Sequence, residues 1–198
     1  MTKATKRTRA LTGTAMLAAV ATILMYMEFP IPIMPGFIKM DISELPALIA
    51  SFAYGPLSGI AVCLIKNLIK LPSTSTAAVG ELFNFVMGAL FVGVAGIVYK
   101  KNKTRKGAII GAVAGALIMA LVSLPYNYFV VYPAYVVMYH LPLEAIIGMY
   151  QAINPNVNGL LACLITFNVP FTFVKGMVDA LLCFLIYKPL SPILHGRK

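Results

Sequence analysis

Five long stretches of this 198-residue sequence contain no Asp, Glu, Lys or Arg. They run over Ala10–Met27, Leu45–Ile65, Leu82–Tyr99, Gly107–Leu143 and Ala145–Val174. About 20 helical residues cross a hydrocarbon layer of about 30 Å, so several of these stretches can span a membrane. Only 11% of the residues are charged, against about a quarter in a soluble domain. The sequence therefore predicts an all-α integral membrane protein and excludes an ordinary soluble enzyme.

A turn signal at Gly55-Pro56 divides the second stretch into two helices. We expect a compact bundle of six transmembrane helices forming a single membrane domain over residues 1–198. The predicted helices lie near residues 10–28, 42–54, 56–71, 78–100, 106–138 and 157–188. The helix at 42–54 would reach only about 20 Å at about 1.5 Å per residue, so we expect its neighbours to shield it.

The basic residues indicate how the bundle is oriented, because most of the 16 Lys and Arg residues lie in short clusters. The clusters precede the first helix, fill the connection between the fourth and fifth helices, and end the chain: Lys3, Lys6, Arg7, Arg9; Lys100, Lys101, Lys103, Arg105, Lys106; Lys188, Arg197, Lys198. With an even number of spans all three share one side, which the positive-inside rule assigns to the cytoplasm. Both termini are therefore predicted to be cytoplasmic. Because the clusters account for most of the basic charge, we expect no nucleic-acid partner despite the net charge of +10.

Several polar residues fall inside the predicted helices, where a charged side chain costs at least about 2.5–3.5 kcal/mol and is therefore functional or paired. Asn168, Thr172, Lys175 and Asp179 are spaced to share one helix face. Glu81 and Asn84 share another, and Asn127 lies at a similar depth. These residues predict a polar pocket that opens to the outside, with Asp179 or Glu81 compensating the charge of Lys175.

Simpler interpretations of the same residues remain. Lys175 and Asp179 can form a local i,i+4 pair, and Asn127, beside Pro125, can cap a kinked helix. Lys66 and Lys70, four residues apart in the third helix, are expected to extend their ammonium groups to the outer interface.

The proline-rich segment 29–40 is too apolar for an ordinary exposed connection. We expect it to fold over the bundle as a lid and to bring Phe37 and Met40 to the pocket. Together with the tyrosines of residues 126–135, these side chains suit a flat heteroaromatic ligand that offers many hydrogen-bonding edges.

Small residues recur every fourth position in two predicted helices, a spacing that allows helices to approach closely. We interpret the series Gly107, Gly111 and Gly115 as internal packing. Ala15 and Ala19 instead predict a contact with a partner helix. The three cysteines lie within apolar stretches and are expected to be small buried hydrophobes, with no metal site.

Three segments of the chain, residues 39–59, 79–88 and 170–176, closely resemble the riboflavin-specific substrate-binding (S) component of energy-coupling factor (ECF) transporters. They read KMDISELPALIASFAYGPLSG, VGELFNFVMG and PFTFVKG. One departure is Thr172, where the family often has an asparagine three residues before the lysine. A hydroxyl also forms hydrogen bonds there, but it replaces an amide that both donates and accepts.

The resemblance implies a non-enzymatic protein of the bacterial cell membrane that captures riboflavin from outside and delivers it inward. It implies three further partners, a transmembrane coupling subunit and two cytoplasmic ATPases, with no cofactor besides the transported ligand. The family's Ala-x-x-x-Ala contact with the coupling subunit carries over to Ala15 and Ala19. Its ligand contacts carry over to Asn127 and Lys175, with Glu81 and Asn84 as further candidates.

Three alternatives stay open from the sequence. The chain can be an S component for another vitamin or small metabolite, or an intramembrane enzyme using Asp179 or Glu81 as acid or base. It can also be a purely structural membrane subunit, which would leave the polar helix face unexplained.

Overall fold

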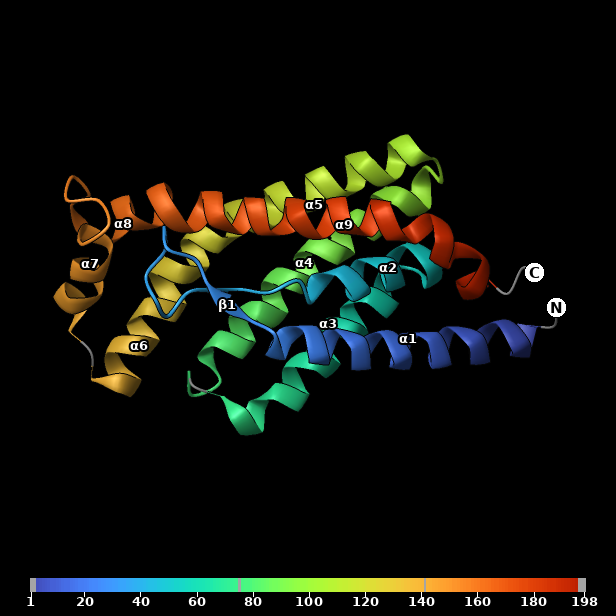
Figure 1. The fold of residues 1–198 in the computed structure, drawn as a ribbon, viewed down its shortest axis with the longest axis horizontal. Helices are drawn as coiled ribbons and strands as arrows, with labels where there is room; N and C mark the ends of the chain where they lie inside the picture. Colours follow the sequence, from blue (N-terminus) through green and yellow to red (C-terminus); the bar gives the residue numbers. More distant parts are fainter. Residues whose placement is uncertain (1–2, 75, 141, 196–198) are drawn as a thin grey trace.

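The computed structural model describes residues 3–74, 76–140 and 142–195, and most of them are helical. The helices pack lengthwise into an elongated bundle (Figure 1). Their bounds are α1 Lys3–Tyr26, α2 Glu44–Tyr54, α3 Pro56–Lys70, α4 Val79–Lys101, α5 Arg105–Tyr126, α6 Tyr132–Tyr139, α7 Leu143–Gln151, α8 Gly159–Cys163 and α9 Val169–His195. One 3-10 turn, η1 (Leu71–Ser73), follows α3.

The structure differs from the predicted helices in three places. The first helix begins at Lys3 and the last continues to His195, beyond the predicted ranges. An additional short helix, α7, lies in a segment that was expected to be a loop. The lid segment contains a two-residue antiparallel ladder, β1 (Phe29–Pro30) with β2 (Lys39–Met40). Arg197 and Lys198 of the last basic cluster lie outside the described residues.

Two of the long helices contain a five-residue π-helical segment. Segment η2 (Asn127–Val131) joins α5 to α6, and η3 (Leu164–Asn168) joins α8 to α9. Each begins six residues before a proline, Pro133 or Pro170. Proline lacks the N–H and its ring clashes with the carbonyl four residues earlier, so the preceding turn widens. Each π segment contains one of the predicted pocket asparagines, Asn127 or Asn168.

Helix α2 forms the centre of the bundle. Every residue from Glu44 to Phe52 is buried, and the helix contacts α1, α3, α4 and α9. The expectation that this short helix is shielded by its neighbours is therefore confirmed. Its first residue, Glu44, is a fully buried acid, which places charge near the middle of the molecule.

The glycine series of α5 packs against α4. A Cβ atom at Gly111 would lie 2.7 Å from the carbonyl oxygen of Ala95, and one at Gly115 would lie 2.5 Å from that of Phe91. Backbones this close leave no room for a side chain, so the interpretation of these glycines as internal packing is confirmed. The three cysteines are buried, as expected.

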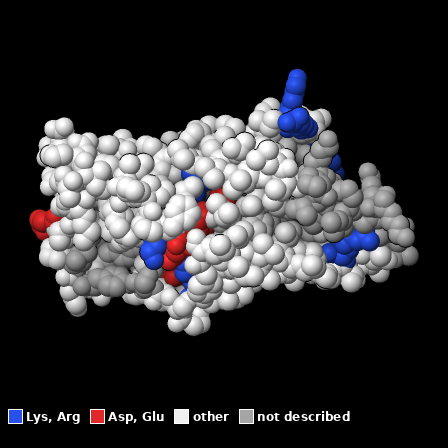
Figure 2. Space-filling model, in the orientation of Figure 1, with Lys and Arg blue, Asp and Glu red and all other residues white. Residues whose placement is uncertain are grey.

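The exterior of the bundle is mostly apolar, and four helical segments are long and apolar enough to cross a membrane: Ala4–Tyr26, Val79–Lys101, Arg105–Met138 and Gly159–Tyr187. Acidic and basic side chains gather in a hollow near the middle of one face, and further basic groups lie at one end (Figure 2). That end contains the start of α1, the turn from α4 to α5, and the end of α9 (Figure 1).

Candidate functional site

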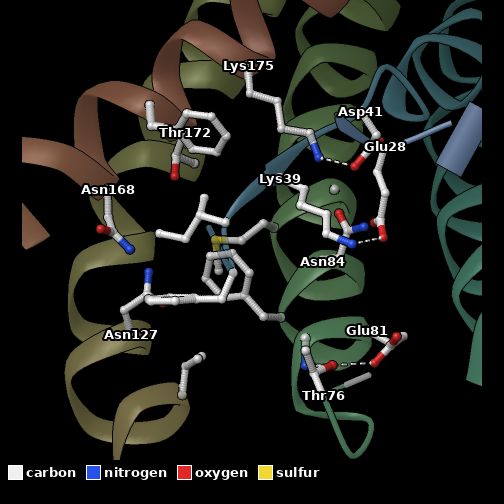
Figure 3. Close-up of a pocket in the computed structure, with 18 of the residues that line it drawn as sticks. Glu28, Lys39, Asp41, Thr76, Glu81, Asn84, Asn127, Asn168, Thr172 and Lys175 are labelled. Carbon is white, nitrogen blue, oxygen red and sulfur yellow. Dashed lines mark hydrogen bonds and ion pairs between the residues drawn. The ribbon is translucent and has the colours of Figure 1, made fainter. Parts of the chain in front are cut away.

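A cavity of about 190 Å³ lies between the lid segment and helices α1–α6 and α9. Figure 3 shows its polar side chains converging from opposite walls. Those that line it are Glu28, Lys39, Asp41, Glu44, Lys70, Thr76, Glu81, Asn84, Asn127, Asn168, Thr172 and Lys175. Phe37, Tyr132 and Tyr135 supply aromatic surface, and Met25, Met87 and Met119 supply flexible apolar surface.

The structure brings together most of the residues that the sequence suggested for a binding pocket. Seven of the eight line this one cavity: Phe37, Glu81, Asn84, Asn127, Asn168, Thr172 and Lys175. Met40 does not line it; the residue is buried beside the cavity in strand β2, paired with Phe29. Side chains separated by more than 130 residues in sequence thus line the same cavity.

Lys175 is compensated by acids other than the expected ones. Its Nζ donates to Oδ2 of Asp41 at 2.8 Å and lies 3.3 Å from Oε2 of Glu44. The alternative in which Lys175 pairs with Asp179 is wrong, because both Asp179 oxygens lack a hydrogen-bond partner among the described residues. The lysine therefore extends from α9 to acids at the start of α2, and not to an acid on its own helix.

The expectation that Lys66 and Lys70 reach the outer interface is also wrong. Lys66 is fully buried and donates to Oε1 of Glu44 at 2.5 Å and to the hydroxyl of Ser43. Lys70 is buried as well, and its Nζ lies 2.6 Å from Oε2 of Glu28. Both ammonium groups pair with carboxylates of the protein, and these hydrogen-bonded pairs offset the desolvation cost of burying the charges.

Ion pairs fix both ends of the lid segment. Glu28, at its start, accepts from Lys70 of α3 and from Lys39 of β2, the latter at 2.9 Å. Burial alone would raise the pKa of Glu28, but the hydrogen bonds from Lys39 and Lys70 hold it below its ordinary value. Asp41 closes the other end by accepting from the backbone N–H and hydroxyl of Ser43, a local turn that leads into α2.

The aromatic wall contains a closed ring of hydrogen bonds. Tyr150 of α7 donates to Oδ1 of Asn168 at 2.7 Å, and Nδ2 of Asn168 donates to the Tyr132 hydroxyl at 3.2 Å. Tyr132 completes the ring by donating to the Tyr150 oxygen. The ring of Phe37 meets the edges or faces of Tyr132, Tyr135 and Tyr150 with centroids 6.2–6.5 Å apart. The lid segment is thereby joined to α6 and α7 through Phe37.

Glu81 is held by two threonines of the segment that precedes α4, and not by a lysine. Its Oε2 accepts from the hydroxyls of Thr74 and Thr76, at 2.7 and 2.9 Å. Thr76 also accepts from the N–H of Gly80, which satisfies one of the free amides at the start of α4. The expected role of Glu81 as counter-charge to Lys175 is therefore wrong, although its side chain does border the cavity (Figure 3).

Asn127 uses only part of its hydrogen-bonding capacity within its own helix. Its Nδ2 donates to the carbonyl of Ser123 at 2.8 Å, and the side chain points toward the cavity (Figure 3). An amide has two donor hydrogens and a carbonyl oxygen that accepts. Asn127 therefore satisfies its helix and still offers groups to a ligand.

Sequence reasoning missed Asp41 and Glu44 as the acids of the site. It also missed Tyr150, which holds the lining residues Tyr132 and Asn168 by hydrogen bonds. A signal existed for the acids, because with only six Asp and Glu in the chain each buried lysine needs one of them. Tyr150 belongs to α7, a helix that was not expected.

The arrangement can bind but offers little for catalysis. Lys175 and Lys66 are each held by carboxylates, and Glu81 accepts two hydroxyl hydrogens. The geometry defines a class of protein: a helical membrane protein with an internal cavity lined by polar and aromatic side chains.

Comparison with known proteins assigns the chain within that class. Residues 9–187 match the family model described as ECF transporter, substrate-specific component, and the chain belongs to this family. The Staphylococcus aureus (strain TCH60) riboflavin transporter RibU is 32% identical over 180 residues, which cover 91% of this chain and 89% of that protein. The Bacillus subtilis (strain 168) riboflavin transporter FmnP is 33% identical over 187 residues, 93% of each.

A solved structure gives the same result. It carries the description "Structure and mechanism of the S component of a bacterial ECF transporter". The match covers 95% of this chain and 98% of the chain in that structure, with a TM-score of 0.74 and 31% sequence identity. The chain is therefore a transport component of the bacterial plasma membrane that crosses it several times, and not an enzyme.

Proposed function

We propose that this protein is a high-affinity riboflavin-binding S component, built as one membrane domain over residues 1–198. Six spans are formed by α1, α2, α3, α4, the continuous α5–α6 rod and the continuous α8–α9 rod. Both termini lie in the cytoplasm. The common location of the start of α1, the α4–α5 turn and the end of α9 at one end of the bundle (Figure 1) supports this orientation.

The single observation that carries the proposal is the cavity, which combines amide, hydroxyl and ammonium groups with aromatic and Met surface. Riboflavin is uncharged, has a flat three-ring system with carbonyl and ring-nitrogen edges, and carries a chain of hydroxyls. Such edges can form hydrogen bonds with the side chains of Asn127, Asn168 and Thr172. Lys175 can donate a further hydrogen bond, and its pairing with Asp41 leaves no net charge beside the ligand. The names of the relatives RibU and FmnP agree with this ligand.

Other cavity residues are assigned more general roles. Asn84 and Glu81 border the ligand from α4, and the ring of Phe37 covers it from the lid segment. Met40 acts indirectly, because it packs in β2 behind the residues that line the cavity.

The lid segment must move for the ligand to enter. A volume of about 190 Å³ is below the roughly 300–1,000 Å³ of sites for ligands of this size. Phe37 lies between three tyrosines and contacts their rings. Withdrawal of Phe37 opens the aromatic side of the cavity to a flat ring, and the return of Phe37 covers that ring.

Delivery requires partners. We propose that the face of α1 with Ala15 and Ala19, both exposed, contacts a transmembrane coupling subunit, and that two cytoplasmic ATPases drive the assembly. Small side chains at this spacing permit close helix contact within the lipid bilayer.

An absorbance spectrum of the protein purified in detergent tests the ligand. Bound riboflavin gives a yellow protein with flavin bands, and denaturation releases one flavin per chain. A colourless protein that releases a different vitamin would support an S component of another specificity and would contradict riboflavin.

A further inference from the structure

A second cavity, of about 320 Å³, lies at the opposite end of the bundle from the lid segment. The turn between α2 and α3 forms one side and the end of α4 forms the other. None of the residues that line it belongs to the ligand cavity described above.

This second cavity is basic on one side and apolar on the other. Lys100 and Lys103 line it, both with exposed side chains, and no carboxylate occurs among the described residues around it. Leu57, on the opposite side, is 80% exposed, the highest exposure of the large apolar side chains described. A ligand that fits must therefore combine negative charge with an apolar part.

The floor of the cavity is rigid and aromatic. Phe52 is buried and its ring centroid lies 4.9 Å from that of Tyr99. The position of α4 against the turn is fixed, because a Cβ atom at Gly96 would lie 2.1 Å from the Ser51 hydroxyl. Tyr54 and Tyr99 also line the space. Tyrosines and lysines at helix ends are typical of the level of lipid headgroups.

We propose that this cavity binds the headgroup of an anionic phospholipid, with phosphatidylglycerol as the representative. Lys100 and Lys103 neutralise the phosphate, the glycerol lies against the aromatic floor, and an acyl chain follows Leu57 along the outside of α3. The inference is independent of the ligand bound at the other end.

The test compares two double variants of the full-length protein in nanodiscs that contain phosphatidylglycerol and phosphatidylcholine. Lys100→Gln with Lys103→Gln removes the two charges that line the cavity. Lys101→Gln with Lys106→Gln removes two charges from the same helix connection that do not line it. Retained lipid is identified and counted by native mass spectrometry after extraction into detergent.

The wild type and the Lys101/Lys106 variant should retain phosphatidylglycerol over phosphatidylcholine, and the Lys100/Lys103 variant should retain at least tenfold less. Ala53→Phe, which fills the cavity and keeps every lysine, should lose the lipid as well. Binding of the transported ligand at the other end reports whether each variant is folded.

Equal loss in the two double variants would contradict the proposal, because it would indicate a diffuse basic surface. So would retention of lipid by Ala53→Phe. A competition with free glycerol phosphate distinguishes a lipid headgroup from a soluble phosphate. If glycerol phosphate displaces the lipid at equal concentration, the cavity is a site for soluble anions and not for a lipid.

Discussion

At the residue scale, the main feature is a cluster of five ionisable groups in the middle of the bundle, four of them buried and one, Lys175, half-buried. Among the residues that the structure describes, the three acids Asp41, Glu44 and Asp179 lie near two cations, Lys66 and Lys175. Each lysine is paired, whereas Asp179 is fully buried and has no hydrogen-bond partner within the described part of the chain. A buried unpaired carboxylate would cost several kcal/mol, so Asp179 is neutral and holds a proton, which balances the cluster.

This assignment predicts the effect of removing the carboxyl group. Asp179→Asn keeps the size and the neutral state, so the free energy of unfolding should change by about 1 kcal/mol or less, or by about 4 °C in the thermal midpoint. Asp41→Asn is the matched control, because it breaks the pair with Lys175 and should cost about 3–5 kcal/mol. A loss of that size in Asp179→Asn would mean that the residue is charged and paired.

The residue scale also shows the limit of sequence reasoning. The polar residues of the cavity could be found because charge and amides are rare inside apolar helices, and Lys175 was recognised in this way. Their partners could not be found from helix periodicity, because Asp41 precedes α2 and meets Lys175 across 134 positions of the chain. Local spacing favoured Asp179 only because it lies one turn away.

At the element scale, the lid segment and the two π segments shape the ligand cavity. The lid segment is fixed by Glu28 at one end and Asp41 at the other. The π segments turn Asn127 and Asn168 out of regular helical register toward the cavity, an irregularity that is often found at functional sites. Helix periodicity assumes uniform turns, so it placed these asparagines on the right helices without revealing the widened turns.

The anchoring of the lid segment predicts a pH dependence. Burial would raise the pKa of Asp41, but the ammonium groups of Lys175 and Lys66 hold it well below the ordinary value of 3.8. A lowered folded-state pKa contributes stability that is complete above the unfolded-state pKa and is lost as the pH falls toward the folded-state value. The thermal midpoint of the empty protein should therefore be flat from pH 8 to about 5 and fall below about pH 4.

The variant Asp41→Asn provides the control for this pH dependence. Its midpoint should lie below that of the wild type at neutral pH. The difference should shrink below about pH 4, where the unfolded wild type takes up a proton on Asp41 and the charge no longer favours the folded state. A constant difference down to pH 3 would show that the carboxylate of Asp41 does not anchor the segment.

At the scale of the whole molecule, the bundle separates its functions along its length. The ligand cavity and lid segment lie toward one end, the basic clusters lie at the other, and α1 presents an exposed apolar face between them (Figures 1 and 2). The apolar stretches predicted this all-helical bundle well, because membrane spans need length and hydrophobicity alone. Helix α7 is short and lies between loops, so hydrophobic length could not reveal it.

The exposed face of α1 predicts how assembly can be separated from binding. Ala15→Trp places a bulky ring on a surface that is open in the isolated protein, so affinity for the ligand should stay within about twofold. Co-purification with the coupling subunit and uptake by cells should be abolished, because close helix contact is prevented. Ala10→Trp, on the same helix outside the Ala15–Ala19 pair, is the control. Loss of ligand binding in Ala15→Trp would show that this face is internal packing.

The central claim is that the cavity around Lys175 binds riboflavin, and the most direct measurement is an equilibrium titration of ligand-free protein by quenching of riboflavin fluorescence. We predict saturation at one riboflavin per chain. The affinity for riboflavin should weaken by about 10- to 150-fold in Lys175→Ala, because a charged hydrogen bond worth about 1.5–3 kcal/mol is lost. The affinity should not change in Lys106→Ala, at the other end of the bundle. An unchanged dissociation constant in Lys175→Ala, or no saturable binding by the wild type, would contradict the claim.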